Sequence, residues 1–489
     1  MATFYVQNFG CRATQADGAA IERQFEERGL ERASGASNAE VVVLNTCTVT
    51  ASADRDARAA IRRVHRENPQ ARIVVTGCYA QRSPEEIAGL AGVTQVIGNS
   101  HKHQLAEIAV AAVAEESKPG NGDGGPPPRF VPIGALTAAW DRSRRPIFIS
   151  DIFAHTELLA APVFDSANER TRPNLKVQDG CDNRCAFCVI PFVRGHSRSL
   201  RLEEVLREVN ALVAAGFREV VISGINLGRW GRDLEPGLRR QGSNGSGQVS
   251  DLGQRPTRDD RRLAFLVRSV LDYTSLEKLR ISSVEPMDWS DELIALMANS
   301  PRIAKHAHVP MQSGSDAVLR RMRRKYRPWH YRQKIETIRA VMPTAAIGAD
   351  VMVGFPGETD SEFEETRRMV EELPFTYLHI FTYSARPGTP AAASSDQVPQ
   401  RVTRNRNRVL RELAAGKKLA FMRSFVGDTL DAITLAGSSH ATTGEGERFT
   451  EALTDNYLSL RLEGHWEPNR WMRARIGAIH DGNLVGTVG

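Results

Sequence analysis

The chain has 489 residues, of which 41% are hydrophobic and 25% are charged, and its formal net charge is +6. This length suits two to four domains with ordinary apolar cores, and the modest basic excess suits a polyanionic partner. Uninterrupted apolar stretches are too short to cross a bilayer, and Met1–Gln7 lacks the basic-then-apolar pattern of a signal peptide. We therefore expect a cytoplasmic protein, with no membrane partner, whose six cysteines are ligands rather than disulfides.

Residues 1–110 alternate between β-branched runs and helical patterns. Strands are predicted at Thr3–Phe9, Val41–Asn45 and Arg72–Thr76, and helices at about 17–29, 51–67 and 84–90. This alternation predicts an α/β domain with a parallel sheet. A cysteine follows each strand, namely Cys11, Cys47 and Cys78. A single strand-end cysteine is more often a packed core residue. Because parallel strands end at one edge of an open sheet, three of them favour a metal cluster there.

Residues 111–170 change character. The segment Lys118–Pro128 is rich in glycine and proline, which is typical of a flexible linker. Pro146–Ala154 is predicted to form an isolated strand. We find no chemistry-bearing motif in this region.

Residues 171–398 return to alternating strands and helices. Strands are predicted at 174–178, 219–223, 278–284, 305–310, 346–353 and 376–383. Six β/α units fit an open or partial barrel, whose site lies at the carboxyl ends of the strands. Gln241–Arg262, which contains GSNGSG, is predicted to be a solvent-exposed insertion without a catalytic part.

The first of these strands leads into three cysteines at spacing C-x3-C-x2-C, Cys181, Cys185 and Cys188. Three thiolates suit a [4Fe-4S] cluster, because three irons gain a protein ligand and the fourth stays open. A structural zinc site normally needs a fourth ligand, which the loop lacks, and disulfides need an oxidising compartment. Inert buried cysteines remain an alternative. Three cysteines within eight residues, in a chain of six, favour the iron–sulfur cluster.

Residues 400–489 form the tail. Arg401–Arg423 is predicted to be a basic helix, and short strands follow at Asp428–Leu435, Glu447–Thr454, Asn456–Leu462, Trp471–Ile479 and Asn483–Thr487. Short strands with turn signals between them predict a small β-barrel.

The cysteine spacing, with Phe187 before the last cysteine, resembles the radical S-adenosylmethionine (SAM) superfamily. The string LKVQDGCDNRCAFCVIPFVRGHSRS is similar to its methylthiotransferases, above all those that act on N6-threonylcarbamoyladenosine in tRNA. The segments NFGCRATQADG, NTCTVT and GCYAQ resemble that family's N-terminal domain, although Arg12 and Thr14 depart from its usual pattern. The tail resembles the RNA-binding TRAM barrel. The resemblance covers nearly the whole chain apart from the linker and the insertion.

The resemblance implies two [4Fe-4S] clusters, an auxiliary one on Cys11, Cys47 and Cys78 and a SAM-cleaving one on the C-x3-C-x2-C loop. It implies that one SAM yields a 5′-deoxyadenosyl radical, that the auxiliary site delivers sulfur and that a second SAM supplies the methyl group. The product would be the 2-methylthio derivative of the modified adenosine at position 37 of a tRNA anticodon loop. A small electron-donor protein, flavodoxin-like or ferredoxin-like, is implied as a partner. No catalytic side chain beyond the cluster ligands is expected.

Polar residues at the ends of the barrel strands are candidates for binding SAM. These are Gly224, Asn226, Glu285 and Gln312. Gly224 and Gly354 would let the backbone approach a ligand closely, and the polar side chains could bond the amino, carboxylate or ribose groups of SAM. The alternative for each is a strand-end cap or a supporting role.

Two basic runs are candidates for RNA contact. The first extends from Arg320 to Arg332, with Tyr326, Trp329 and Tyr331 interleaved, and the second lies in the tail helix. The predicted contacts are Arg320, Arg324, Arg404, Arg406 and Arg408. Basic residues bind phosphates without reading sequence, and aromatic rings stack on bases. The alternative is a solvated helix face.

Three rival functions remain open. Two share the chemistry, namely a methylthiotransferase for isopentenyl-adenosine in tRNA and one for an aspartate of a ribosomal protein. The third is a non-catalytic RNA-binding protein whose cysteines hold metal.

Overall fold

The computed structural model describes residues 2–116, 146–156, 158, 171–234, 262–436 and 449–489. Its contacts divide the chain into two compact units. The first holds Met1–Ala161 with Val189–His196, and the second holds Pro162–Cys188 with Ser197–Gly489. The linker predicted at Lys118–Pro128 and nearly all of the predicted insertion lie outside the described residues.

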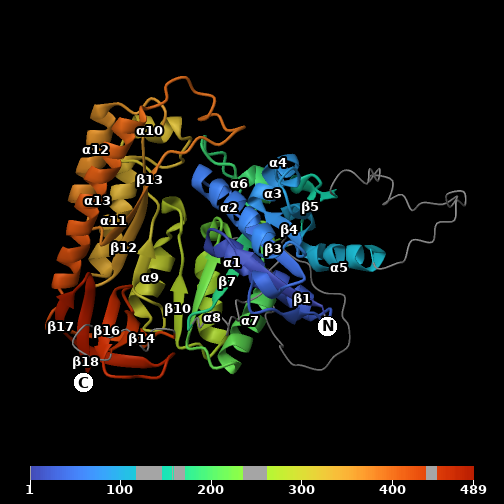
Figure 1. Ribbon diagram of the computed structural model, residues 1–489. Helices are drawn as coiled ribbons and strands as arrows, with labels where there is room; N and C mark the ends of the chain where they lie inside the picture. The colour runs from blue at the N-terminus through green and yellow to red at the C-terminus, as the bar shows by residue number, and fades with distance from the viewer. Residues whose placement is uncertain (1, 117–145, 157, 159–170, 235–261, 437–448) are drawn as a thin grey trace, which may run out of the picture. The chain divides into compact units, whose positions relative to one another are not determined.

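The first unit is built on a six-stranded sheet with the order β2-β1-β3-β4-β5-β6, in which all neighbouring strands run parallel (Figure 1). The strands are β1 (Thr3–Asn8), β2 (Glu31–Arg32), β3 (Val41–Thr46), β4 (Arg72–Gly77), β5 (Val93–Ile97) and β6 (Ile147–Phe148). The helices are α1 (Arg12–Glu26), α2 (Ala51–Glu67), α3 (Cys78–Arg82), α4 (Pro84–Ala88), α5 (Leu105–Glu116) and α6 (Ile190–Arg194). The predicted α/β domain with a parallel sheet is confirmed.

Helices cover both faces of this sheet, which explains why the central strand β3 is apolar throughout. Val42 and Leu44 pack in one buried cluster with Ile61 of α2. Val41 and Val43 face the other way, into a second buried cluster that contains residues of α1 and α5. A parallel strand that is buried on both faces reads as a continuous hydrophobic run rather than an alternating one.

The second unit contains six strands that follow one another in chain order. They are β7 (Asn174–Asp179), β9 (Glu219–Gly224), β10 (Lys278–Ile281), β11 (His306–His308), β12 (Ala346–Val353) and β13 (Tyr377–Thr382). β7, β9 and β10 pair in parallel, as do β11, β12 and β13. Two parallel bridges, Leu279–Ile303 and Ser283–His308, join the two groups. The predicted six-unit partial barrel is confirmed, and the short β8 (Arg198–Ser199) pairs antiparallel with β7.

Helices follow the strands of the partial barrel. They are α7 (Leu202–Ala214), α8 (Leu263–Tyr273), α9 (Asp291–Asn299), α10 (Asp316–Arg321), α11 (Pro328–Val341), α12 (Asp360–Glu372) and α13 (Gln400–Arg423). Thr359 and Glu362 form a reciprocal capping box at the start of α12, which satisfies backbone N–H groups of its first turn.

The predicted small barrel of the tail is confirmed. Its strands close in the order β14-β15-β16-β18-β17. They are β14 (Thr429–Thr434), β15 (Phe449–Thr454), β16 (Ser459–Glu463), β17 (Trp471–His480) and β18 (Asn483–Val488). Asn469 donates to the carbonyl of Gly216 at 2.7 Å, and Asn456 donates to that of Thr344 at 3.1 Å, so this barrel is bonded to the partial barrel.

The prediction of an isolated strand at Pro146–Ala154 is wrong. β6 joins the sheet of the first unit as its edge strand, and the carbonyl of Pro146 accepts a hydrogen bond from Val96. The sequence concealed this pairing because the partner strand lies about fifty residues earlier. Among the described residues, no helix combines the length and hydropathy that spanning a bilayer requires.

Candidate functional site

The C-x3-C-x2-C loop follows β7 directly. Gly180 begins it with φ +70°, a left-handed conformation that favours glycine and turns the chain away from the strand. Cys181, Cys185 and Cys188 are all half-buried and free of disulfides. The backbone N–H of Asn183 donates to Cys181 Sγ at 3.4 Å, so the loop already offers a donor to a thiolate.

Side chains from three other parts of the partial barrel surround these sulfurs. Asn226 Nδ2 lies 3.6 Å from Cys181 Sγ. Arg324 Nη1 lies 3.2 Å from Cys185 Sγ, and Arg324 is also ion-paired with Glu285. Burial raises the pKa of the Cys181 thiol, and the neighbouring Cys185 raises it further. Thiolates at this loop therefore need the charge and hydrogen bonds that these neighbours supply.

Two of the residues predicted to bind SAM, Asn226 and Glu285, are brought to the loop by the fold, and SAM binding by them stays a prediction. Gly224 is required by packing within the chain, since a Cβ there would lie 2.8 Å from Gln178 Oε1. Gly354 is likewise covered by the chain itself, with Thr403 Oγ1 2.4 Å from the position of a Cβ. Close packing against other parts of the chain therefore explains why glycine stands at both positions, without a bound ligand.

Gln312 has an unusual backbone. Its φ is +62°, which non-glycine residues adopt rarely and which tends to occur at functional sites. Two hydrogen bonds of 2.8 Å to β12 hold it there, one from its N–H to the carbonyl of Asp350 and one from Met352 N–H to its own carbonyl. The side chain of Gln312 is therefore presented beside β12 by an enforced conformation.

The second cysteine set lies in the first unit, at the carboxyl ends of the adjacent strands β1, β3 and β4. Cys47 and Cys78 are buried and Cys11 is exposed. Burial and the neighbouring thiols of Cys78 and Cys11 raise the pKa of Cys47 to about 12. Gly10, with φ +100°, approaches so closely that a Cβ would lie 2.8 Å from Cys47 Sγ. The predicted convergence of the three strand ends is confirmed.

Buried cations accompany this second set. Lys102 Nζ and Arg194 Nη2 each lie 2.9 Å from the same oxygen of Asp17, and all three side chains are almost fully buried. The pKa of Lys102 is lowered by burial, against the opposing effect of Asp17. Asn99 Nδ2 lies 3.6 Å from Cys78 Sγ. Sequence patterns do not reveal this group, because Asp17, Arg194 and the segment with Asn99 and Lys102 are far apart in the chain.

Two of the predicted RNA contacts are wrong. Arg324 is 8% exposed and serves the cysteine loop, and Arg406 is 4% exposed and paired with Glu358 and Asp360. Tyr326 and Tyr331 are core residues, whereas Trp329 is 56% exposed. The remaining predicted contacts lie on the surface of α10 and α13, namely Arg320, Arg404 and Arg408. Arg320 and Arg408 carry acidic neighbours one helical turn away.

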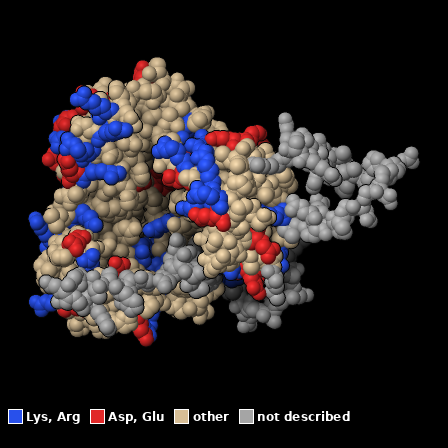
Figure 2. Space-filling model, in the orientation of Figure 1, with Lys and Arg blue, Asp and Glu red and all other residues tan. Residues whose placement is uncertain are grey.

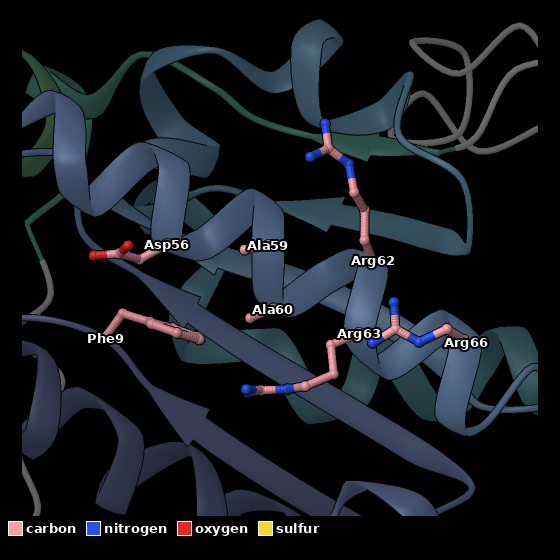
Figure 3. Close-up of a pocket in the computed structure, with 7 residues that line it drawn as sticks. All are labelled: Phe9, Asp56, Ala59, Ala60, Arg62, Arg63 and Arg66. Atoms are coloured by element: carbon pink, nitrogen blue, oxygen red, sulfur yellow. The ribbon is translucent and has the colours of Figure 1, made fainter.

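The sequence analysis did not predict a basic hollow that lies in the first unit. It has a volume of about 570 Å³, and Figure 3 shows arginines projecting from α2 beside Phe9, the residue after β1. Its lining residues are Phe9, Asp56, Ala59, Ala60, Arg62, Arg63 and Arg66. The three arginines are exposed and have no ion-pair partner within the described ranges. Figure 2 shows basic side chains gathered over α2. The signal in the sequence was three arginines within five residues of a predicted helix, of which Arg62 and Arg66 lie one turn apart on the same face.

Two protein families match separate parts of the chain. Residues 3–98 match the model of an uncharacterized protein family, UPF0004, and residues 175–370 match the radical SAM superfamily. The first match spans all three strand-end cysteines of the first unit, and the second spans the C-x3-C-x2-C loop and the partial barrel.

Curated relatives align over almost the whole chain. A threonylcarbamoyladenosine tRNA methylthiotransferase MtaB of Bacillus subtilis is 35% identical over 468 residues, which cover 95% of this chain and 91% of the relative. A protein of the same name from Aquifex aeolicus is 33% identical and covers 96% and 99%. A tRNA-2-methylthio-N(6)-dimethylallyladenosine synthase of Thermobifida fusca is 32% identical and covers 89% and 78%.

Among solved structures, the chain is similar to the radical S-adenosylmethionine methyltransferase TsrM from Kitasatospora setae. The TM-score is 0.53 and the identity 14%, and the alignment covers 80% of this chain and 75% of that chain. At this identity the likeness concerns the fold.

Proposed function

Because this chain belongs to the radical SAM tRNA methylthiotransferases, we propose that it converts N6-threonylcarbamoyladenosine at position 37 of tRNA to its 2-methylthio derivative. The observation that carries the choice of substrate is the alignment with relatives of that name over 95% and 96% of the chain. A relative that acts on dimethylallyladenosine is 32% identical, so that substrate is the second candidate.

The family uses SAM and [4Fe-4S] clusters, and the residues at both sites fit them. At the loop, none of the three cysteines is in a disulfide, and Cys181 and Cys185 meet donors from Asn183, Asn226 and Arg324. The Oδ1 atom of Asn226 is buried and has no hydrogen-bond partner among the described residues, so the site has polar capacity left for a ligand. When bound, SAM and the reduced cluster supply the radical chemistry that an unactivated aromatic C–H bond requires.

The side chains around the loop have positioning and electrostatic tasks. Arg324 places a positive charge 3.2 Å from Cys185 Sγ, and its ion pair with the half-buried Glu285 offsets the cost of burying the guanidinium. Cys11, Cys47 and Cys78 supply three thiolates for the auxiliary cluster, beside the cations of Lys102 and Arg194. A small electron-donor protein, flavodoxin-like or ferredoxin-like, is part of the proposal as the source of the reducing electron.

We also propose that the arginines of the α2 hollow in the first unit bind phosphates of the tRNA, and that Arg320, Arg404 and Arg408 in the second unit bind tRNA phosphates as well. The α2 arginines and Arg404 have no ion pair among the described residues and suit the phosphate backbone, whereas Arg320 and Arg408 would exchange their exposed pairs with Asp316 and Glu412 for phosphates. Such contacts position RNA without reading its sequence. Replacing Arg62, Arg63 and Arg66 together by glutamine should reduce the slope of log affinity against log salt by about 2, since each phosphate contact contributes about 0.7–0.9.

A matched control is available on α12. Arg367 and Arg368 are paired with Glu364 and, for Arg367, also with Glu371, so replacing both arginines by glutamine should leave the slope unchanged. An unchanged slope in the α2 variant would remove the hollow from the RNA-binding surface. The same measurement on Arg404 and Arg408 variants tests the contribution of α13.

The decisive experiment is an anaerobic assay of the reconstituted protein with SAM, reductant and tRNA from a strain lacking the modification. The tRNA is then digested, and the masses of its nucleosides are measured by mass spectrometry. A methylthio mass gain on threonylcarbamoyladenosine is the expected result. The same gain on dimethylallyladenosine alone would keep the chemistry and replace the substrate. Absence of SAM cleavage in protein with a full complement of iron would refute the proposal.

A further inference from the structure

Two histidines and an aspartate form a cluster that the chemistry above does not use. His308 ends β11, Asp350 lies on β12 and His379 lies on β13. A ring nitrogen of each histidine and a carboxylate oxygen of the aspartate all lie within 4.8 Å of one another. His308 is 8% exposed, and its Nε2 lies 3.3 Å from Asp350 Oδ1 without forming a hydrogen bond. A buried nitrogen in this state is uncommon in a native protein and calls for an explanation.

The strand pattern shows which way this cluster faces. Along β12, Ala349, Val351 and Val353 are fully buried, whereas Asp350 and Met352 point to the opposite face and are half-buried. Met352 packs against the buried apolar cluster that includes Ala186, between two cysteines of the C-x3-C-x2-C loop. Asp350 is two residues from Met352, about 7 Å along the strand. The cluster therefore lies on the face that looks toward the cysteine loop.

An aromatic ring bounds the cluster on its other side. Gly348 precedes Asp350 on the same face of β12, and a Cβ there would lie 2.0 Å from Tyr377 Cζ, so the tyrosine ring covers the glycine. The Tyr377 ring stacks on His308 with centroids 5.9 Å apart and meets His379 edge-on at 5.4 Å. The polar cluster thus lies between an aromatic floor and the loop that holds the cysteines.

We propose that His308, Asp350 and His379 form the subsite for the polar N6 substituent of the substrate adenosine. This inference rests on the proposed function and adds to it the residues that distinguish a threonylcarbamoyl group from an apolar one. That group carries a carboxylate, a hydroxyl and a urea. Imidazole N–H groups suit the carboxylate and the urea oxygen, and the Asp350 carboxylate suits the hydroxyl or a urea N–H.

The same cluster disfavours an apolar substituent. A dimethylallyl group would cover His308 and Asp350 without offering them a hydrogen bond, and buried unpaired polar groups cost far more than a lost contact. Sites built to hydrogen-bond a substrate group reject analogues that lack it more strongly than apolar pockets reject a polar analogue. The three residue types would also suit a divalent metal ion. The position in front of the cysteine loop favours the substrate, and the metal is an outcome of the test below.

The test replaces His379 by phenylalanine, which keeps a ring against Tyr377 and removes the donor. The holoenzyme, with both clusters assembled, is assayed anaerobically on tRNA carrying threonylcarbamoyladenosine. We expect kcat/KM to fall roughly 10- to 100-fold, mainly through KM, because one hydrogen bond to a charged group is lost. SAM cleavage without tRNA should be unchanged. His379→Gln, which keeps an N–H donor, should recover part of the loss, and His155→Phe in the first unit should behave as the wild type.

The outcomes separate the inference from the function on which it rests. Wild-type activity on threonylcarbamoyladenosine with undiminished kcat/KM in His379→Phe would overturn the subsite and leave the proposed function intact. Wild-type activity on dimethylallyladenosine alone would overturn both. One equivalent of a divalent metal besides iron in the wild-type holoenzyme, absent from His379→Phe, would overturn the subsite in favour of a metal site. Equal iron content and melting temperature of the variants would show that they fold.

Discussion

Replacing Arg280 by methionine should destabilise the second unit, because the buried carboxylate of Glu219 would lose its main ion-pair partner. Arg280 on β10 and Glu219 on β9 are both 0% exposed, and Arg280 Nε lies 2.6 Å from Glu219 Oε1. Arg280 also donates to the carbonyls of Thr454 and Asp455 at 3.4 and 3.1 Å, where β15 turns toward β16. One residue thus neutralises a buried charge and bonds the C-terminal barrel to the partial barrel.

The magnitude follows from these contacts. Removing one partner of a buried ion pair costs about 3–5 kcal/mol. Arg172 lies 3.4 Å from Glu219 and offsets part of that cost, so we expect the lower end, about 3 kcal/mol. For a unit of this size, about 2 °C per kcal/mol gives a melting temperature roughly 6 °C lower. Thermal and urea unfolding of the anaerobic holoenzyme measure both quantities.

The pH dependence identifies the carboxylate as the cause. Burial alone would raise the pKa of Glu219, but Arg280 and Arg172 lower it below its ordinary value. In the wild type its contribution to stability is therefore present above the ordinary carboxyl pKa and is lost only as the pH falls through the lower native pKa. In the variant, burial dominates and raises the pKa. The stability of the variant is then lost as the pH rises above the ordinary carboxyl pKa, so the destabilisation is larger at neutral pH than at the ordinary carboxyl pKa.

A double variant provides the control for this reasoning. Arg280→Met with Glu219→Gln removes both charges and should recover most of the stability, since an uncharged pair does not carry the desolvation penalty. An equal loss at both pH values, with no recovery in the double variant, would refute the buried charge as the cause.

Three further perturbations test the sites. Gly348→Ala should cost about 1–3 kcal/mol in unfolding experiments, because the new methyl would lie 2.0 Å from Tyr377 Cζ. Arg324→Met should speed the loss of iron to a chelator several-fold, because the donor 3.2 Å from Cys185 Sγ is removed, and Arg324→Lys should do so less. Cys47→Ser should lower the iron content from about eight to about four per chain and abolish the methylthio product, while SAM cleavage persists.

Each of these has a matched comparison. Gly477→Ala meets nothing closer than 3.9 Å and should leave the melting temperature unchanged, so an equal loss at both glycines would show a general effect of the substitution. Iron release at the wild-type rate from Arg324→Met would remove this residue from the support of the loop. Full iron content in Cys47→Ser would remove Cys47 from the auxiliary site.

Patterns of hydrophobic and β-branched residues predicted those features, such as strands, that depend on residues close together in the sequence. The six strands of the partial barrel were found because β-branched runs of four to eight residues recur between helical patterns. The RNA roles predicted for Arg324 and Arg406 were wrong because they too were predicted from a local pattern, a run of basic residues. A basic run looks the same whether its residues face solvent or a buried carboxylate, and the partners Glu285 and Glu358 lie tens of residues away.

The sequence by itself determined the parallel α/β organisation and both cysteine sets, because strand-end position in a parallel sheet is enough to place distant residues at one edge. Only the tertiary structure decided which charged side chains lie beside the two cysteine sets. The pairs Arg324–Glu285 and Arg194–Asp17 join residues 39 and 177 positions apart. The cluster of His308, Asp350 and His379 likewise exists only because three strands with their own registers lie side by side. Contacts between residues so far apart depend on how the chain folds, and the periodicity of hydrophobic residues along the sequence does not predict them.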